Sequence, residues 1–212
     1  MKCSTSLWSA DLSNLAAEIK RVEPYSDRFH IDVADGHYVS SLLFFPDLVK
    51  SMRVHSELPF EVHLTVTDPQ SWVEPFVSAG ADIVIFCLNS HPNPNEVIDE
   101  IKSRGRRAGI SLPVTDSVEK LDPYLDQIDT ATIMSTGMGI KGAEMDPGIP
   151  DKVQRLRKRL TERGLTTQIE VDGGIRKKTV PLIKKAGADF IVPGSLMFND
   201  HPQTVRHWLD SL

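Results

Sequence analysis

The stretch SAGADIVIF at residues 78–86 joins the end of an amphipathic segment to a run of apolar, mostly β-branched residues. Nearly the same joint returns as KAGADFIVP at residues 185–193. In both, the glycine can end a helix in the left-handed conformation immediately before a buried strand begins. Because the joint is used twice, we predict a chain built from repeated helix-to-strand units.

The alternation of strand-like and helix-like segments continues along almost the whole chain. Short apolar runs rich in β-formers predict strands at residues 2–8, 28–34, 60–66, 82–88, 107–112, 130–135, 168–172 and 189–194. Longer amphipathic runs predict helices at residues 12–22, 71–80, 95–105, 152–164, 178–187 and 202–212. A weaker helical pattern at 118–125 is short and is interrupted by Pro123.

This order of elements predicts the fold class. Strict alternation of strand and helix implies parallel strands joined by right-handed crossovers. Eight such units favour an α/β fold of the closed (β/α)8 type, a TIM barrel, as a single domain over residues 1–212. The alternative is an open doubly wound sheet, which usually has a glycine-rich first turn for a nucleotide. Since SLWSADLS at residues 6–13 has no glycine, we predict the barrel.

Composition limits the class of protein further. The chain is 40% hydrophobic and 25% charged with a net charge of −5, which is ordinary for a soluble globular protein. Its most basic stretch, RLRKRLTER at 155–163, is typical of a solvated helix face rather than a nucleic-acid site. Cys3 and Cys87 are the only cysteines, and no apolar run reaches membrane-spanning length. We expect a cytoplasmic protein with no nucleic acid and no membrane as partner.

The segment HIDVADGHYV at residues 30–39 is unusually polar for a strand. Active sites of barrels lie at the C-terminal ends of the strands, and alternation places His30 and Asp32 on one face. His63 on the third strand and Asp172 at the end of the seventh complete a candidate set. A single strand histidine is more often a hydrogen-bonded core residue. Two buried aspartates with two histidines, however, favour one divalent transition metal per chain: zinc, manganese, iron or cobalt.

Two further features surround this candidate centre. Asp35 and His37, in the DGH that follows the second strand, are expected to form a turn or support the site rather than bind metal. Glycine-rich loops after the sixth, seventh and eighth strands, at 137–142, 172–174 and 193–195, predict a phosphate site built from backbone N–H groups. Lys141 in the first of these loops is either an added cation for that site or a solvated surface residue.

Such a pocket suggests proton transfer next to a carbonyl group. One carboxylate would remove a proton from the carbon beside the carbonyl, and the other would return it to the opposite face. The metal would bind the carbonyl and hydroxyl oxygens and stabilise the enediolate. No GxSxG motif occurs, and no strand centre offers a lysine for a Schiff base.

With these motifs assembled, the chain resembles the ribulose-phosphate 3-epimerase family from about Ser4 to Phe198. The resemblance rests on STSLWSADL (4–12), FHIDVADGHYV (29–39), VHLTV (62–66), EVDGGI (170–175) and PGSLMF (193–198). It implies a metal-dependent isomerase, a 3-epimerase of carbohydrate phosphates, acting on a small phosphorylated ketose; we also expect a homo-oligomer.

The resemblance also implies a set of site residues. The metal would be held by His30, Asp32, His63 and Asp172, and Asp32 and Asp172 would be the catalytic acid/base pair. Substrate would be bound by Ser6, His63, Met134, Gly139, Gly142, Gly173, Gly174, Gly194 and Ser195, of which the last four would hold the phosphate.

Departures from the family pattern lie around the sugar rather than among these catalytic residues. Family members usually have methionine at the positions of Ala34 and Thr65, both beside the enediolate, whereas Met134 is kept. The loop GMGIKGA at 137–143 keeps Gly139 and Gly142 but lacks the usual aromatic residue and glutamine, and Ser40, Ser41, Phe45 and the segment FCLNS (86–90) also differ. These departures suggest that the substrate is a ketose phosphate other than ribulose 5-phosphate.

Two alternatives remain. Another enediolate reaction, an isomerisation or a decarboxylation, would fit the same scaffold, although EVHLTVTD at 61–68 lacks the lysine that barrel decarboxylases of sugar phosphates place on this strand. A sugar-phosphate-binding protein without turnover would not need the paired bases Asp32 and Asp172.

Overall fold

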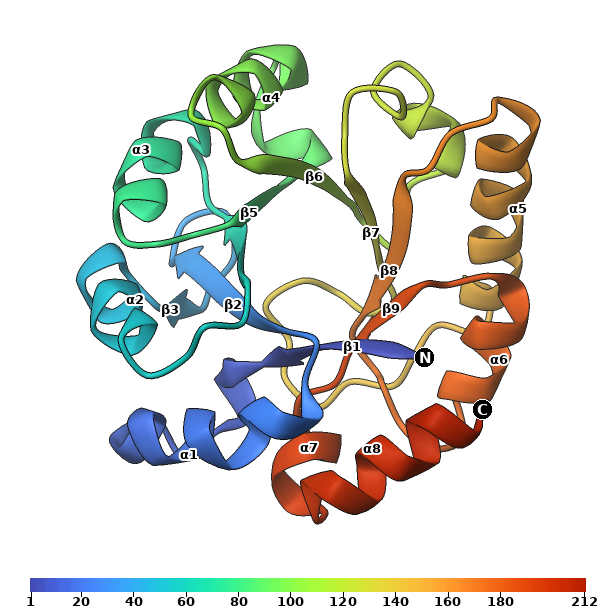
Figure 1. Ribbon diagram of the computed structural model, residues 1–212. Coiled ribbons are helices and arrows are strands. Elements are labelled where there is room, and N and C mark those ends of the chain that lie inside the picture. The colour runs from blue at the N-terminus through green and yellow to red at the C-terminus, as the bar shows by residue number, and fades with distance from the viewer.

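Eight parallel strands pair in a closed ring in the computed structural model, which describes residues 1–212 (Figure 1). β1 pairs with β2 on one side and with β9 on the other, and this double pairing closes the barrel. The (β/α)8 fold class predicted from the alternation is confirmed. The barrel strands are β1 Lys2–Ser6, β2 Arg28–Asp35, β4 Phe60–Thr65, β5 Ile83–Cys87, β6 Arg107–Leu112, β7 Thr130–Met134, β8 Gln168–Asp172 and β9 Phe190–Val192.

Helices form a ring outside the strands (Figure 1). Each of the longer predicted helices is present, with ends shifted by a few residues, and no helix is long and apolar enough to cross a membrane. The helices are α1 Leu15–Val22, α2 Pro46–Arg53, α3 Gln70–Ser78, α4 Pro94–Ser103, α5 Ile149–Glu162, α6 Val180–Ala186, α7 Ser195–Asn199 and α8 Pro202–Ser211.

The structure differs from the sequence-based expectation at a few elements. The weak pattern at 118–125 forms only a 3-10 turn, Val118–Leu121, and the first strand ends at Ser6 because Leu7–Ser9 turns into a 3-10 helix. Helices α2 and α7 were not predicted. Strand β3, Leu42–Leu43, was not predicted either, and it runs antiparallel beside the end of β2. Two- to eight-residue elements of this kind carry too little periodicity to be recognised from sequence.

Successive side chains of each strand point alternately out toward the helices and into the barrel. The outward-facing residues, such as Ile31, Val62 and Val84, are fully buried and join the apolar core shared with the helices. The inward-facing residues of β2 and β4 are largely polar, whereas those of β5 are Ile83, Ile85 and Cys87. Arg28 of β2 contacts Glu170 of β8 across the barrel axis, because β1 and β9 lie between these strands in the ring. The polar site is therefore built inside the barrel and the apolar core lies around it.

The repeated joint has the backbone conformation predicted for it. Gly80 and Gly187 have φ angles of 106° and 105°, a region that side-chain-bearing residues avoid. Each also lies under an arginine stem: a Cβ on Gly80 would approach Arg53 Cδ to 2.8 Å, and a Cβ on Gly187 would approach Arg157 Cγ to 2.9 Å. The glycine is thus required by the turn and by the packing of the arginine.

The aspartate two residues after each glycine ties the joint to the preceding barrel strand. Asp82 Oδ2 accepts a hydrogen bond from the N–H of Phe60 at 2.9 Å and pairs with Arg53 at 3.1 Å. Asp189 Oδ2 likewise accepts from the N–H of Ile169 at 2.7 Å and pairs with Arg157. The GAD sequence therefore ends a helix, starts a strand and satisfies a backbone donor of the neighbouring strand.

Replacing Gly187 with alanine should destabilise the protein by about 2–4 kcal/mol, because the left-handed backbone and the contact with Arg157 add together. Gly105→Ala is the matched control: its φ is 69°, and no atom lies within 4 Å of the added Cβ, so it should cost about 1 kcal/mol. Urea unfolding of both variants measures the difference. Equal losses would show that the arginine contact is not a constraint.

Candidate active site

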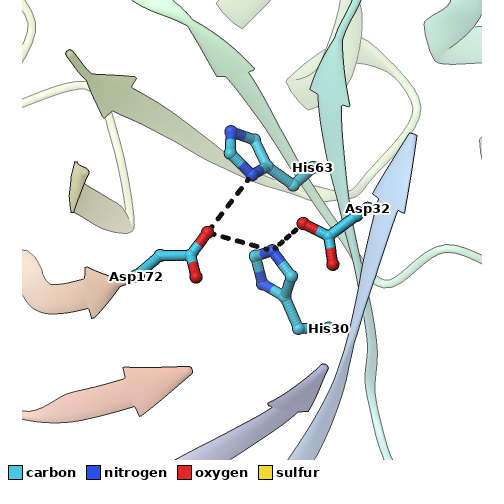
Figure 2. A group of neighbouring side chains, drawn as sticks. All are labelled: His30, Asp32, His63 and Asp172. Carbon is cyan, nitrogen blue, oxygen red and sulfur yellow. Dashed lines mark ion pairs between the residues drawn. The ribbon is translucent and has the colours of Figure 1, made fainter. Parts of the chain in front are cut away.

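Four side chains meet inside the barrel near the C-terminal ends of the strands (Figure 2). They are His30 and Asp32 of β2, His63 of β4 and Asp172 of β8, and one nitrogen or oxygen from each lies within 4.8 Å of the others. His30 Nε2 is 3.4 Å from Asp32 Oδ1 and 3.8 Å from Asp172 Oδ2, and His63 Nδ1 is 3.9 Å from Asp172 Oδ2. The structure therefore brings together all four residues that the sequence suggested as one group.

Strand register explains this convergence. His30 and Asp32 are two residues apart on β2 and so face the same side. Asp32 is directly opposite His63 in the pairing of β2 with β4, which places these two side chains next to each other. Asp172 is the last residue of β8 and reaches the group from the other side of the barrel, as Figure 2 shows.

Each histidine is held by one ring nitrogen and leaves the other without a protein partner. His30 Nδ1 lies 2.9 Å from Glu61 Oε1, and His63 Nε2 lies 2.8 Å from Ser111 Oγ. The remaining atoms, His30 Nε2 and His63 Nδ1, are buried and form no hydrogen bond. Both face Asp172, at distances beyond a hydrogen bond.

This donor set fits a divalent metal ion. Bonds of about 2.1 Å in a tetrahedral site separate neighbouring ligand atoms by about 3.4 Å, close to the spacing of the two free ring nitrogens and the two carboxylates. Two imidazoles and two carboxylates suit zinc, manganese or iron(II). Buried polar atoms without partners are costly in a protein interior, and a cation between these four groups would satisfy them.

The two aspartates have pKa shifts in opposite directions. Burial raises the pKa of Asp32, but the neighbouring His30 outweighs it and the pKa is lowered to about 2, with Ser6 donating a hydrogen bond to Oδ2 at 2.7 Å. Burial raises the pKa of Asp172 to about 7; His30 offsets part of this effect, while the negative charges of Asp32 and Glu170 add to it. One carboxylate is thus ionised over the range in which the other holds a proton.

The two histidines differ in the same way. Burial works against a charge on His30, yet Asp32 and Glu61 outweigh burial and raise its pKa well above the usual value. Burial and the nearby His30 lower the pKa of His63 to about 4. Without a metal, a proton on His30 therefore supplies the positive charge that the carboxylates require.

A cavity of about 250 Å³ opens above this group. It is lined by Asp32, His63 and Asp172, whereas His30 lies beneath and does not line it. All the other residues that the resemblance implies for the substrate also line it: Ser6, Met134, Gly139, Gly142, Gly173, Gly174, Gly194 and Ser195. Lys141 lies at the same cavity, where its ammonium group donates a hydrogen bond to the carbonyl of Trp8 at 2.9 Å.

The glycines after β8 line the cavity and are also required by the packing of the loops. Gly173 and Gly174 have φ angles of 96° and 57°. A Cβ on Gly173 would come within 2.5 Å of Thr136 Oγ1, and a Cβ on Gly174 within 2.5 Å of the backbone nitrogen of Met145. The loops that follow β7 and β8 therefore lie against each other, and larger residues here would push them apart.

The DGH segment forms a turn, as predicted. The carboxylate of Asp35 accepts hydrogen bonds from the N–H groups of His37 at 2.8 Å and Tyr38 at 2.9 Å. It also accepts from the N–H of Thr67 at 2.8 Å, which links the loops after β2 and β4. Asp35 is thus occupied with the backbone and does not join the four-residue group.

The two positions where the family usually has methionine differ in location. Thr65 lines the cavity. Ala34 does not; it lines a neighbouring apolar groove together with Leu43, Phe45 and Trp72. Ala34 is nevertheless paired directly with Thr65 in the register of β2 with β4 and lies two residues after Asp32, so both positions are on the inward face of their strands.

Sequence reasoning missed a charged layer directly below the four residues. Arg28 Nη2 lies 2.8 Å from Glu61 Oε2 and 2.5 Å from Glu170 Oε2, and all three side chains are buried. A signal for this layer was present, because each of these residues precedes a residue of the upper group by two positions and so faces the barrel interior. Arg28 precedes His30, Glu61 precedes His63, and Glu170 precedes Asp172.

Comparison with known proteins identifies relatives over nearly the full chain. The ribulose-phosphate 3 epimerase family matches residues 2–198. A ribulose-phosphate 3-epimerase of Treponema pallidum is 38% identical over 195 residues, 92% of this chain and 89% of that protein. Another, from Bacillus subtilis, is 34% identical over 200 residues, 93% of this chain and 92% of that protein. Among solved structures, the 3-hexulose-6-phosphate synthase of Salmonella typhimurium superposes with a TM-score of 0.73 at 17% identity, covering 100% of this chain and 99% of the other, a likeness of fold.

The raised pKa of Asp172 predicts a pH-dependent stability of the metal-free protein. Between about pH 4 and 7 the folded state binds more protons at Asp172 than the unfolded state does, so this residue's contribution to stability falls as pH rises. Asp172→Asn, a neutral side chain of the same shape, removes the fall. We therefore expect the free energy of unfolding of the metal-free variant, relative to that of metal-free wild type, to rise by about 2–4 kcal/mol as pH is raised from 4 to 8, as measured by urea unfolding. Parallel stability curves for the two proteins would contradict the shift.

Proposed function

Because the chain belongs to the ribulose-phosphate 3-epimerase family, we propose that it inverts the carbon next to the carbonyl of a phosphorylated ketose. Membership makes the protein an isomerase, an epimerase acting on carbohydrates. The proposal concerns the residues that perform the reaction, the metal and the substrate.

One observation carries the assignment of the proton-transfer pair. Asp32 and Asp172 approach the centre from opposite sides (Figure 2), and in the metal-free protein their pKa values are shifted in opposite directions. Inversion at carbon requires a group that removes a proton on one face and a group that delivers one on the other. Paired carboxylates held in unlike environments are suited to these two roles.

The chain's own contacts prepare each carboxylate for its role. Asp32 accepts the Ser6 hydroxyl on Oδ2, which leaves Oδ1 to receive a proton from substrate. The side chain of Asp172 is 14% exposed and lines the cavity, so its proton can reach the face of the substrate opposite Asp32. Met134 and Thr65 line the cavity and would shield the reacting carbon from water.

A divalent metal is part of the proposal. His30 and His63 would hold it through their free nitrogens, together with Asp32 and Asp172. When bound, it would supply positive charge beside the oxygen atoms that become negative as the proton leaves. The phosphate would be bound by backbone N–H groups of the loops at 173–174 and 194–195, both of which line the cavity.

Decarboxylation and binding without turnover both fit the site less well than epimerisation. A decarboxylase of the kind considered above would have a lysine on β4, but this strand has Glu61, His63 and Thr65 on its inward face. A binding protein without turnover has no use for two carboxylates with separated pKa values. A cytoplasmic location and a homo-oligomer stay predictions.

Deuterium exchange started from each epimer of the ketose phosphate separately tests the two-base assignment. Asp172→Asn should retain wash-in of solvent deuterium from one epimer, lose at least about 100-fold of it from the other, and abolish their interconversion. Asp32→Asn should show the opposite preference, because it removes the base on the other face. NMR follows both reactions, with the metal content of each variant measured alongside. Identical exchange losses for both epimers in both variants would reject two separate bases.

Thr65→Met tests which wall selects the sugar. A methionine here would extend an apolar thioether into the cavity, and kcat/KM for ribulose 5-phosphate should rise by about tenfold. Ala34→Met is the companion variant: Ala34 is paired directly with Thr65 in the register of β2 with β4, so a methionine there should add to the same wall and also raise kcat/KM. If neither variant responds, the loop at 137–143 is the selecting element instead.

A further inference from the structure

His30 belongs to two groups of potential metal ligands at once. Its Nε2 faces the upper group with Asp32, His63 and Asp172, and its Nδ1 faces a lower group with Glu61 and Glu170. An imidazole whose proton is free to sit on either nitrogen would present its lone pair to either group. The hydrogen bonds of His30 therefore determine which of its ring nitrogens is available to a metal.

The lower group already contains a cation of the protein itself. The Arg28 guanidinium lies within ion-pair distance of both glutamates, at 2.8 Å from Glu61 and 2.5 Å from Glu170, and Arg28 is 2% exposed. Hydroxyl groups complete this arrangement: Ser4 donates to Glu61 at 2.8 Å and Thr132 donates to Glu170 at 3.1 Å. With the positive charge already in place, the lower carboxylates are compensated without a metal ion.

Only one of the two glutamates engages the histidine. Glu61 Oε1 lies 2.9 Å from His30 Nδ1, a hydrogen-bond distance, whereas Glu170 Oε1 lies 4.0 Å away. The ion pair with Arg28 and the hydrogen bond with His30 favour the ionised form of Glu61. An ionised carboxylate accepts hydrogen bonds but donates none. The proton of the imidazole is thereby kept on Nδ1, and the lone pair of Nε2 is directed at the upper group.

We propose that Glu61 is the positioning residue of the metal centre: it holds the proton of His30 on Nδ1 and so presents Nε2 to the cation, while Arg28 keeps Glu61 available for this role. The inference rests on the metal-dependent function proposed above. A carboxylate behind a metal-bound histidine orients the ring and strengthens it as a ligand. His63 receives a weaker form of the same support, because its Nε2 is bonded to the neutral hydroxyl of Ser111 at 2.8 Å.

Glu61→Gln tests the proposal against Glu170→Gln as a matched control. Both variants replace a buried carboxyl group beside Arg28 with an amide, but only the first alters the hydrogen bond to His30. Zinc affinity, measured by competition with a chelator, should fall by about 10- to 100-fold in Glu61→Gln. In Glu170→Gln it should fall much less. Equal losses in the two variants, or an unchanged affinity in Glu61→Gln, would overturn the role of Glu61.

A measurement on the unaltered protein decides the matter if Glu61→Gln does not fold. In protein loaded with cadmium-113 and labelled with nitrogen-15, His30 should carry its proton on Nδ1 and show metal coupling at Nε2. A proton on Nε2, or coupling at Nδ1, would overturn the proposal. Wild-type protein that binds neither zinc nor cadmium would instead remove the metal from the proposed function, and this inference with it.

Discussion

The contact between Arg28 and the two glutamates across the barrel is the interaction on which the rest of the site depends. A guanidinium taken out of water is stable only where charge and hydrogen bonds replace its hydration. Glu61 and Glu170 provide the negative charge, and Glu170 also accepts a hydrogen bond from Arg28 Nη2. The three side chains come from β2, β4 and β8, so the contact ties together strands that are not all neighbours in the ring. Most barrels fill this layer with branched apolar residues. Here it is a charged support beneath the candidate centre.

The centre inherits its electrostatic character from this layer. The negative charge of Glu170, below Asp172, contributes to the raised pKa of Asp172. The pKa of Asp32 is instead lowered mainly by the neighbouring His30. Two aspartates of the same kind, only a few ångströms apart, thus come to differ in their affinity for a proton. The difference arises from their neighbours rather than from their own chemistry, and it is what a reaction that moves a proton across a substrate requires.

Much of the fold could be predicted because the controlling signals are local. The joints at Gly80 and Gly187 are readable from GAD, since a left-handed glycine and a strand-starting aspartate depend on a few adjacent residues. Elements such as β3 and α7 could not be predicted, because they are short and exist through contacts with distant segments. The site was partly readable for the same reason. His30 and Asp32 share a face by strand alternation alone, but which of the paired residues Thr65 and Ala34 lines the cavity depends on where the cavity opens.

The sequence by itself determined that eight strand–helix units would form and which side chains would face inward, because both follow from periodicity and from residue types a few positions apart. It also placed His30, Asp32 and His63 within strands and Asp172 at the end of one. Only the tertiary structure decided that Arg28 meets Glu170 across the barrel, which ring nitrogen of each histidine is left free, and which aspartate holds a proton. Closing the ring fixes distances between residues more than a hundred positions apart, and hydrogen bonds and pKa values depend on those distances rather than on the order of residues in the chain.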